Sequence, residues 1–124
     1  MRCATSEHSR PMTWSSLLHL GLHAAVPGAV ALLFFRPRWK KAWLIMFSTM
    51  LVDLDHLLAD PIYDPNRCGL GFHPLHTYPA IVAYVLLLVP QVSRLAALGL
   101  LIHMALDGLD CILMWHRATD VYSR

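Results

Sequence analysis

Ionisable side chains lie inside apolar, helix-like segments of this chain, and no other feature restricts its folding as strongly. Three apolar segments carry them, and a turn-rich stretch adds two histidines. The groups are His19 and His23; Asp53, Asp55, His56 and Asp60; His73 and His76; and His103, Asp107 and Asp110. A charge at bilayer depth costs several kcal/mol, so such residues normally face a bundle interior and mark a functional site. The pattern predicts that these side chains meet inside the fold.

Four segments are apolar enough to be considered as membrane spans. They cover residues 15–35, 42–58, 77–92 and 95–115. A straight span needs about 20 residues; the first and last segments reach this, the second is near the lower limit and the third is short. Only 15% of the residues are charged, against about a quarter in ordinary soluble domains. We therefore expect an all-α fold: one integral-membrane domain over residues 1–124, built as a four-helix transmembrane bundle in a lipid bilayer.

A soluble four-helix bundle is the alternative fold. The segments 45–52 and 82–89 are apolar on nearly every helical face, whereas a soluble surface helix would show a polar stripe. This observation favours the membrane interpretation.

Basic residues in the connecting loops predict the orientation. Arg36, Arg38, Lys40 and Lys41 stand together between the first two spans, and Arg94 lies between the last two. Because positively charged loops stay in the cytoplasm, both termini and the irregular stretch 60–78 should lie on the outer face. The net charge of the chain is only +2, and its basic residues are not interleaved with aromatic residues. Neither feature indicates a nucleic-acid partner.

Helical spacing predicts which of the ionisable side chains share a face. His19 and His23 are four residues apart, so they share one face of a helix. A spacing of three or four residues also relates the members of two further sets: Asp53, His56 and Asp60; and His103, Asp107 and Asp110. If the spans are antiparallel, these three helical groups lie near one membrane face. His73 and His76, in the loop over residues 60–78 that we expect to be functional, lie near the same face. We expect a metal site between the helices near that face.

Histidine and aspartate are suitable ligands for a divalent metal such as zinc. The donors exceed the four that one structural zinc takes, which indicates up to two ions. The predicted metal ligands are His19, His23, Asp53, His56, His73, His76, His103 and Asp107. Asp55 falls about 100° from His56 on a helix and is expected beside the metal ligands or as a catalytic group.

Two cysteines, Cys68 in the outer loop and Cys111 near the outer end of the last span, are placed to form a disulfide if that face is oxidising. Two unpaired thiols are an equal alternative, because sequence does not reveal how closely their Cα atoms approach.

Three motifs resemble those of a known group of proteins. They are Leu51-Val52-Asp53-Leu54-Asp55-His56, His73-Pro74-Leu75-His76-Thr77 and His103-Met104-Ala105-Leu106-Asp107. In this order they resemble small bacterial inner-membrane proteins described as membrane-bound, metal-dependent hydrolases, which include LexA-regulated members. The chain looks closer still to a related uncharacterised family of short membrane proteins. Val52 stands where the hydrolase pattern has proline, and the His73–His76 segment is two residues shorter than its counterpart.

The resemblance implies a location and an activity. It implies a multi-pass protein of the bacterial inner membrane, whose termini are then periplasmic. The hydrolase group is in turn similar to zinc-dependent phospholipase C and P1-type nucleases, which implies a helical, multi-zinc phosphodiesterase site. By position, the motif residues correspond to His19 or His23, Asp53, Asp55, His56, His73, His76, His103 and Asp107.

We accordingly expect a metal-dependent hydrolase acting on a small-molecule or lipid phosphoester. Bound metal would polarise the phosphoryl oxygen and lower the pKa of a bound water, and Asp55 or Asp110 would be the general base. One alternative is a metal or proton transporter, which with four spans would need a homo-oligomer. Another alternative is a haem-binding bundle in which His23 and His103 bind the iron, but it leaves the aspartates unexplained. A further alternative is a metal that only stabilises the fold.

Overall fold

Helices alone build the described part of the chain. The computed structural model describes residues 14–60, 62, 64 and 67–122. Over these residues the α-helices are α1 (Trp14–Phe34), α2 (Trp39–Ser48), α3 (Tyr78–Leu86) and α4 (Arg94–Tyr122), and the 3-10 helices are η1 (Arg36–Arg38), η2 (Thr49–Leu58) and η3 (Pro74–His76). The predicted all-α class is confirmed for this part of the chain.

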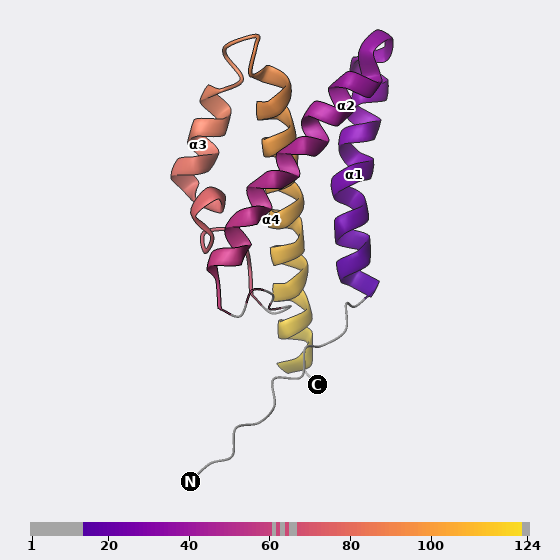
Figure 1. Ribbon diagram of the computed structural model, residues 1–124. Coiled ribbons are helices and arrows are strands. Elements are labelled where there is room, and N and C mark those ends of the chain that lie inside the picture. The colour runs from indigo at the N-terminus through magenta and orange to yellow at the C-terminus, as the bar shows by residue number, and fades with distance from the viewer. Residues whose placement is uncertain (1–13, 61, 63, 65–66, 123–124) are drawn as a thin grey trace.

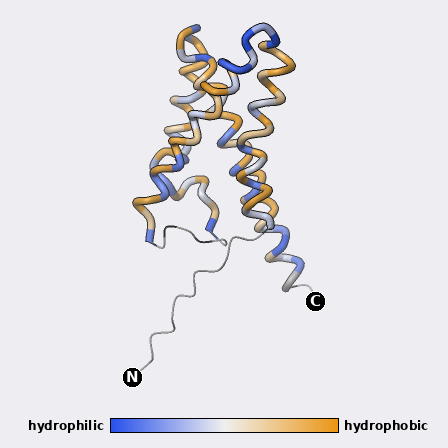
Figure 2. Tube along the Cα trace, turned by 45° about the vertical axis from the view of Figure 1, so that its right-hand side comes forward, coloured by the Kyte–Doolittle hydropathy of each residue, from blue (hydrophilic) through white to orange (hydrophobic). Residues whose placement is uncertain are grey.

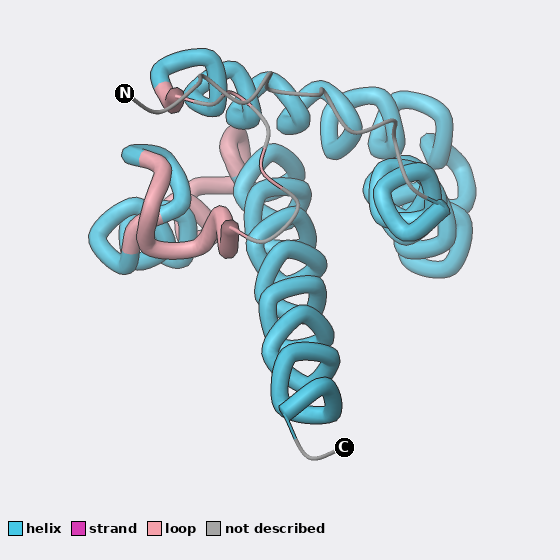
Figure 3. Tube along the Cα trace, turned by 90° about the horizontal axis from the view of Figure 1, so that it is seen from below, coloured by secondary structure: helices cyan, strands magenta, loops and turns pink. Residues whose placement is uncertain are grey.

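Four helical segments run alternately up and down (Figure 1). α4 lies between α1 and α3, and α2 crosses it obliquely; the view from below shows the same order (Figure 3). α1 and α4 are long and apolar enough to cross a membrane, over Trp14–Phe34 and Arg94–Asp120. The other two predicted spans do not form continuous α-helices of that length, so the structure supports two such helices where the sequence predicted four.

The second predicted span changes helix type at its centre. α2 ends at Ser48, and residues 49–58 continue as the 3-10 helix η2. The hydroxyl groups of Ser48 and Thr49 donate to the carbonyl oxygens of Ile45 and Met46, three residues earlier. Such local bonds compete with the α-helical pattern. A 3-10 helix has three residues per turn, so η2 presents different faces from the α-helix that the sequence predicted.

The third predicted span is shortened by the turn that follows it. α3 ends at Leu86, and residues 87–93 form turns and bends. Ser93 Oγ donates to Leu87 O, and the Arg94 guanidinium donates to the carbonyl oxygens of Leu88 and Val89. These side chains satisfy carbonyl groups that no longer have helical partners.

The distribution of polar and apolar side chains is the reverse of that in a soluble bundle. Buried ionisable residues are His23, Asp55, His73, His76, His103 and Asp107, almost as many as the buried hydrophobic residues Ala31, Ala42, Met46, Val52, Tyr84, Ala97 and Met104. Many large apolar side chains face outward instead, among them Leu33, Leu58 and Val92, the last 98% exposed. The polar groups therefore form much of the interior.

α2 and α4 pack closely because α4 carries a glycine at their crossing. A Cβ atom on Gly99 would lie 2.7 Å from Met46 Cα and 2.8 Å from Met46 O. These are backbone atoms, so the helices themselves would have to separate. Ala31, Ala42 and Met46 form the core beside this crossing.

We predict that Gly99→Ala destabilises the protein by about 1–3 kcal/mol, the usual cost of overpacking, lowering the unfolding midpoint measured by circular dichroism in detergent. Gly21→Ala is the matched control, because a Cβ there meets nothing within 4 Å. A helical Gly→Ala change should itself stabilise by up to about 1 kcal/mol. Equal midpoints for the two variants would refute this role of Gly99.

Candidate metal centre

Two histidines and two aspartates from three separate elements meet at one point. Asp53 comes from η2, His76 from η3, and His103 and Asp107 from α4. His76 Nε2 lies 3.3 Å from Asp53 Oδ1 and 3.2 Å from Asp107 Oδ2. His103 Nε2 lies 3.1 and 3.3 Å from the same two oxygens. The two nitrogens are 3.3 Å apart, and the two oxygens are within 4.8 Å of each other. We call these four residues the central cluster.

The distances in the central cluster suit a small divalent cation. Five of its six pairs are separated by 3.1–3.3 Å. The centre of a tetrahedron with such edges lies about 2 Å from each corner, which is the usual Zn–N and Zn–O bond length. The donor set is also the mixture of imidazole and carboxylate that zinc accepts.

Asp107 connects the central cluster to a second group of ligands. Its Oδ2 atom belongs to the central cluster, whereas Oδ1 lies 3.2 Å from His19 Nε2 and 3.3 Å from His23 Nε2. His19, His23 and Asp107 form another set able to hold a metal ion. The predicted common face of His19 and His23 on α1 thus turns towards α4. The carboxylate of Asp107 therefore belongs to both groups of potential ligands.

The hydrogen bonds of His23 leave one nitrogen ready to bind a cation. Nδ1 lies 2.9 Å from the carbonyl oxygen of His19; since a carbonyl only accepts, Nδ1 carries the proton. Nε2 is buried and has no hydrogen-bond partner among the described residues. In the neutral ring its lone pair faces the Asp107 carboxylate, and a cation between them removes this repulsion. The residues present therefore fit a bound metal.

Asp55 orients His76 from the side opposite the central cluster. Its Oδ2 atom accepts hydrogen bonds from His76 Nδ1 at 3.1 Å and from the backbone N–H of Leu75 at 2.8 Å. Tyr84 O–H donates to the carbonyl oxygen of Leu75. A carboxylate that binds the outer nitrogen of a metal-ligating histidine sets its tautomer and orientation. The geometry thus gives Asp55 a positioning role, while the predicted role as general base stays a prediction.

The electrostatic environment of His76 favours positive charge. Burial acts to lower the pKa of its imidazole, but hydrogen bonds with Asp107, Asp53 and Asp55 outweigh burial and raise the pKa to about 10. The same carboxylates that stabilise a proton there would stabilise a metal cation.

His56 and His73 lie together at the side of the central cluster. His56 Nδ1 is 3.1 Å from Asp55 Oδ1, within a third possible ligand group formed by Asp55, His56 and His76. The His73 ring stacks on that of His56 with centroids 3.7 Å apart, and His73 belongs to none of the ligand groups found among the described residues. Burial and the neighbouring His56 both lower the pKa of His73. The structure places it against a predicted ligand and outside the ligand groups.

The two remaining acidic candidates lie outside the described ligand groups. Asp60 is exposed and follows the end of η2, so the predicted common face with Asp53 and His56 is wrong. The cause is the 3-10 geometry of η2, followed by extended backbone at Ala59. Asp110 is half-buried on α4 and belongs to none of the described ligand groups.

A cleft of about 390 Å³ leads to both ligand groups. His19, Asp53, His56 and Asp107 line it, together with Asp110 and the apolar side chains of Leu20, Ile62 and Met114. Arg67 and Arg117 also line it. The sequence pattern does not reveal these two arginines, because no periodic repeat links a loop residue to one near the end of a long helix.

A disulfide between Cys68 and Cys111 joins the histidine-bearing loop to α4, with Cα atoms 5.1 Å apart. Of the two alternatives that the sequence left open, the structure contains the bonded one. Leu70 adds an apolar contact, since a Cβ on Gly108 would lie 3.3 Å from Leu70 Cδ1. Cys111 is one helical turn beyond Asp107, so the bridge lies beside the ligands.

Residues 13–114 match a protein family of unknown function, DUF6122. The chain belongs to this family. No curated protein and no solved structure matches it. The part matched to DUF6122 contains every residue of the ligand groups and both cysteines of the disulfide. Membership of this family therefore assigns no activity to the chain.

We predict that His76→Ala removes most of the metal from the DUF6122 protein purified in detergent without added metal. The change deletes a central-cluster ligand and leaves Asp55 without its imidazole partner. Elemental analysis by mass spectrometry gives the metal content. His116→Ala is the matched control, because His116 is exposed and outside the ligand groups. Unchanged metal content in His76→Ala would exclude the central cluster as the binding site.

We also predict that the double substitution Cys68→Ala, Cys111→Ala weakens metal binding and lowers stability. The bridge closes a loop of sequence separation 43, for which the chain-entropy relation gives at most about 4 kcal/mol. Competition with a chromogenic chelator would measure the affinity, and dithiothreitol treatment of the wild type should shift it in the same direction. Identical affinities in all three samples would show that the bridge does not hold the ligands in place.

Proposed function

We propose that this chain is a membrane-embedded, metal-dependent hydrolase acting on a phosphoester or lipid-like substrate. The observation that carries the proposal is the division of the Asp107 carboxylate, with one oxygen facing His76 and His103 and the other facing His19 and His23. A bridging carboxylate between two imidazole pairs is the arrangement expected of a two-metal hydrolytic site.

The location proposed is the bacterial inner membrane. Supporting it are the outward-facing apolar side chains, the two helices long enough to span and the resemblance of the three sequence motifs to inner-membrane hydrolases. In this proposal α2 with η2, and α3 with its flanking turns, complete a four-pass bundle. Both termini and the cleft face the periplasm, and the basic turn around η1 faces the cytoplasm. An oxidising periplasm is consistent with the disulfide.

The proposed ligands are those of the two groups that share Asp107. Asp53, His76, His103 and Asp107 would hold one ion, and His19, His23 and Asp107 a second. Metal bound there would act as a Lewis acid on a phosphoryl oxygen and lower the pKa of a bound water. Zinc is proposed because the edge lengths and the donor types match its usual coordination.

The cleft residues would bind and orient the substrate. Arg67 and Arg117 would attract the negative charge of a phosphate group, and the apolar wall formed by Leu20, Ile62 and Met114 would accommodate a hydrocarbon portion. Asp110 lines the same cleft without belonging to a ligand group. We assign it the role of general base, which accepts a proton from the attacking water.

Transport of an ion across the fold is a weaker alternative. His19, Asp53 and Asp107 line the cleft, whereas the narrow space lined by His23, Met46, Gly99 and His103 has no room for a water molecule. The lack of room for water there favours hydrolysis in the cleft over passage of an ion.

We predict that the metal-loaded protein cleaves bis(4-nitrophenyl) phosphate, releasing coloured nitrophenolate. Asp107→Asn should abolish both metal binding and cleavage. Asp110→Asn should keep its metal but slow cleavage by about 10²–10⁴-fold, the usual contribution of a general base. Helical content measured by circular dichroism should be unchanged in both variants.

His116→Ala provides the control for the hydrolysis assay, since its exposed side chain lies outside both the ligand groups and the cleft. Wild-type cleavage rates in Asp107→Asn would overturn the proposed site. A wild-type protein that holds two ions but cleaves no phosphoester would refute the hydrolase function while leaving the metal centre intact.

A further inference from the structure

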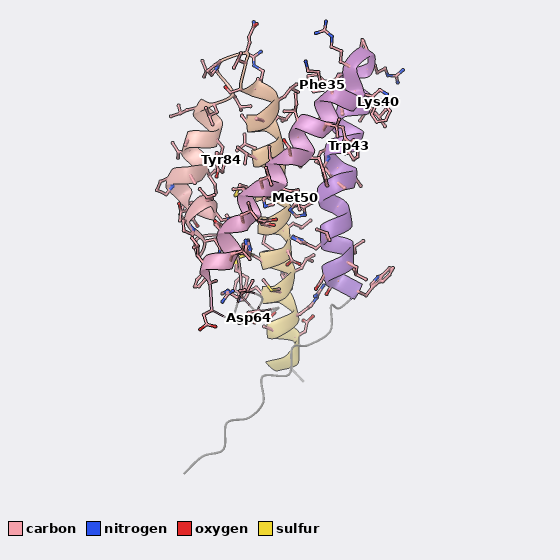
Figure 4. All side chains as sticks on the ribbon, in the orientation of Figure 1. Phe35, Lys40, Trp43, Met50, Asp64 and Tyr84 are labelled. Atoms are coloured by element: carbon pink, nitrogen blue, oxygen red, sulfur yellow. A yellow bond between two sulfur atoms is a disulfide. The ribbon has the colours of Figure 1, made fainter. Side chains whose placement is uncertain are left out.

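Charge is divided between the two ends of the bundle. Residues 36–41, which comprise η1 and the first three residues of α2, carry Arg36, Arg38, Lys40 and Lys41, all of them exposed. There is no Asp or Glu between residues 24 and 52, nor between 79 and 106. The described acidic residues all lie towards the other end. Figure 2 shows the hydrophilic turn at the tip of the bundle, and Figure 4 places Lys40 and Asp64 at opposite ends. We call residues 36–41 the basic turn.

The cations of the basic turn lack anionic partners in the described part of the chain. The ion pairs found among the described residues of the ligand groups join histidines to aspartates, and none of them involves Arg36, Arg38, Lys40 or Lys41. The contact found for the turn is that of Lys40 Nζ with the Trp39 ring, at 5.8 Å from the centroid. Like charges this close in sequence repel one another unless external anions neutralise them.

The basic turn is ordered by its own backbone. The N–H of Phe35 donates to Ala31 O, and the N–H of Arg38 donates to Phe35 O. Pro37 within η1 restricts the backbone further. Leu33 and Phe34, immediately before the turn, are 66% and 76% exposed. The result is a preformed group of cations directly beside apolar surface.

Cations beside exposed apolar side chains match the boundary between lipid headgroups and acyl chains. A basic segment next to a membrane helix attracts anionic lipids, by roughly fivefold in binding for each Lys or Arg near the surface. We infer that the basic turn binds the phosphate groups of anionic phospholipids. This inference rests on the proposed membrane location and not on hydrolysis, because the turn and the metal centre lie at different ends of the fold.

The test is native mass spectrometry of detergent-solubilised protein with equimolar phosphatidylglycerol and phosphatidylcholine. We expect the wild type to retain phosphatidylglycerol preferentially. The variant Arg36→Gln, Arg38→Gln, Lys40→Gln, Lys41→Gln should lose that preference, by up to about 600-fold because four such contributions multiply. The matched control Arg36→Lys, Arg38→Lys, Lys40→Arg, Lys41→Arg keeps the charge and should keep the preference. Raising the salt from 50 to 500 mM should weaken it, since charge attraction is screened.

Asp107→Asn separates this inference from the proposed hydrolase. If lipid binds at the basic turn, this variant should retain the wild-type preference even though the metal centre is lost. A preference abolished by Asp107→Asn but kept by the four Gln changes would place the lipid in the cleft and overturn the inference. Equal retention of both lipids by the wild type would also overturn it, without affecting the hydrolase. Should the fourfold Gln variant fail to fold, as shown by lost helical content in circular dichroism, Lys40→Gln with Lys41→Gln provides the same comparison.

Discussion

The shared carboxylate of Asp107 is the interaction on which the interior of this protein depends. Four imidazole nitrogens from α1, η3 and α4 lie within 3.2–3.3 Å of its two oxygens. Burying so many polar groups without compensation would be costly. A cation bound among these facing lone pairs would offset this cost and would join α1, η2, η3 and α4 at one point.

The ligands are held by a surrounding layer of contacts that is itself well defined. Asp55 fixes the tautomer of His76 and links η2 to η3, and Tyr84 anchors η3 to α3. The disulfide joins the loop to α4 near Asp107. Ligands on short 3-10 segments are thereby restrained from several sides. A preorganised site of this kind loses little entropy when a metal or a substrate binds.

The same arrangement explains why the apolar side chains face outward. The centre of the bundle is occupied by polar ligands, so the large hydrophobic residues cover the surface instead, where a lipid environment would solvate them. Small residues such as Gly99 permit the close helix contacts that remain. In our proposal the cleft and the basic turn then lie at opposite membrane faces, with substrate chemistry at one and lipid headgroups at the other.

Much of the site could be predicted from the sequence because helical periodicity requires only local geometry. The pairing of His19 with His23, and of His103 with Asp107, follows from a four-residue repeat that tertiary contacts did not alter. The all-α class likewise follows from the apolar segments. The lengths of the second and third segments were overestimated, because side-chain hydroxyl groups and turn residues that compete for backbone bonds are not visible in hydropathy.

By itself, then, the sequence determined that ionisable residues would be buried and which faces of α1 and α4 would carry them, since these depend on composition and on the period of the α-helix. Only the tertiary structure decided that η2 would direct Asp53 to the central cluster and Asp55 to the back of His76. It also decided that Asp107 would serve both ligand groups and that Cys68 would meet Cys111. These outcomes depend on distances between segments remote in sequence, which local patterns do not specify.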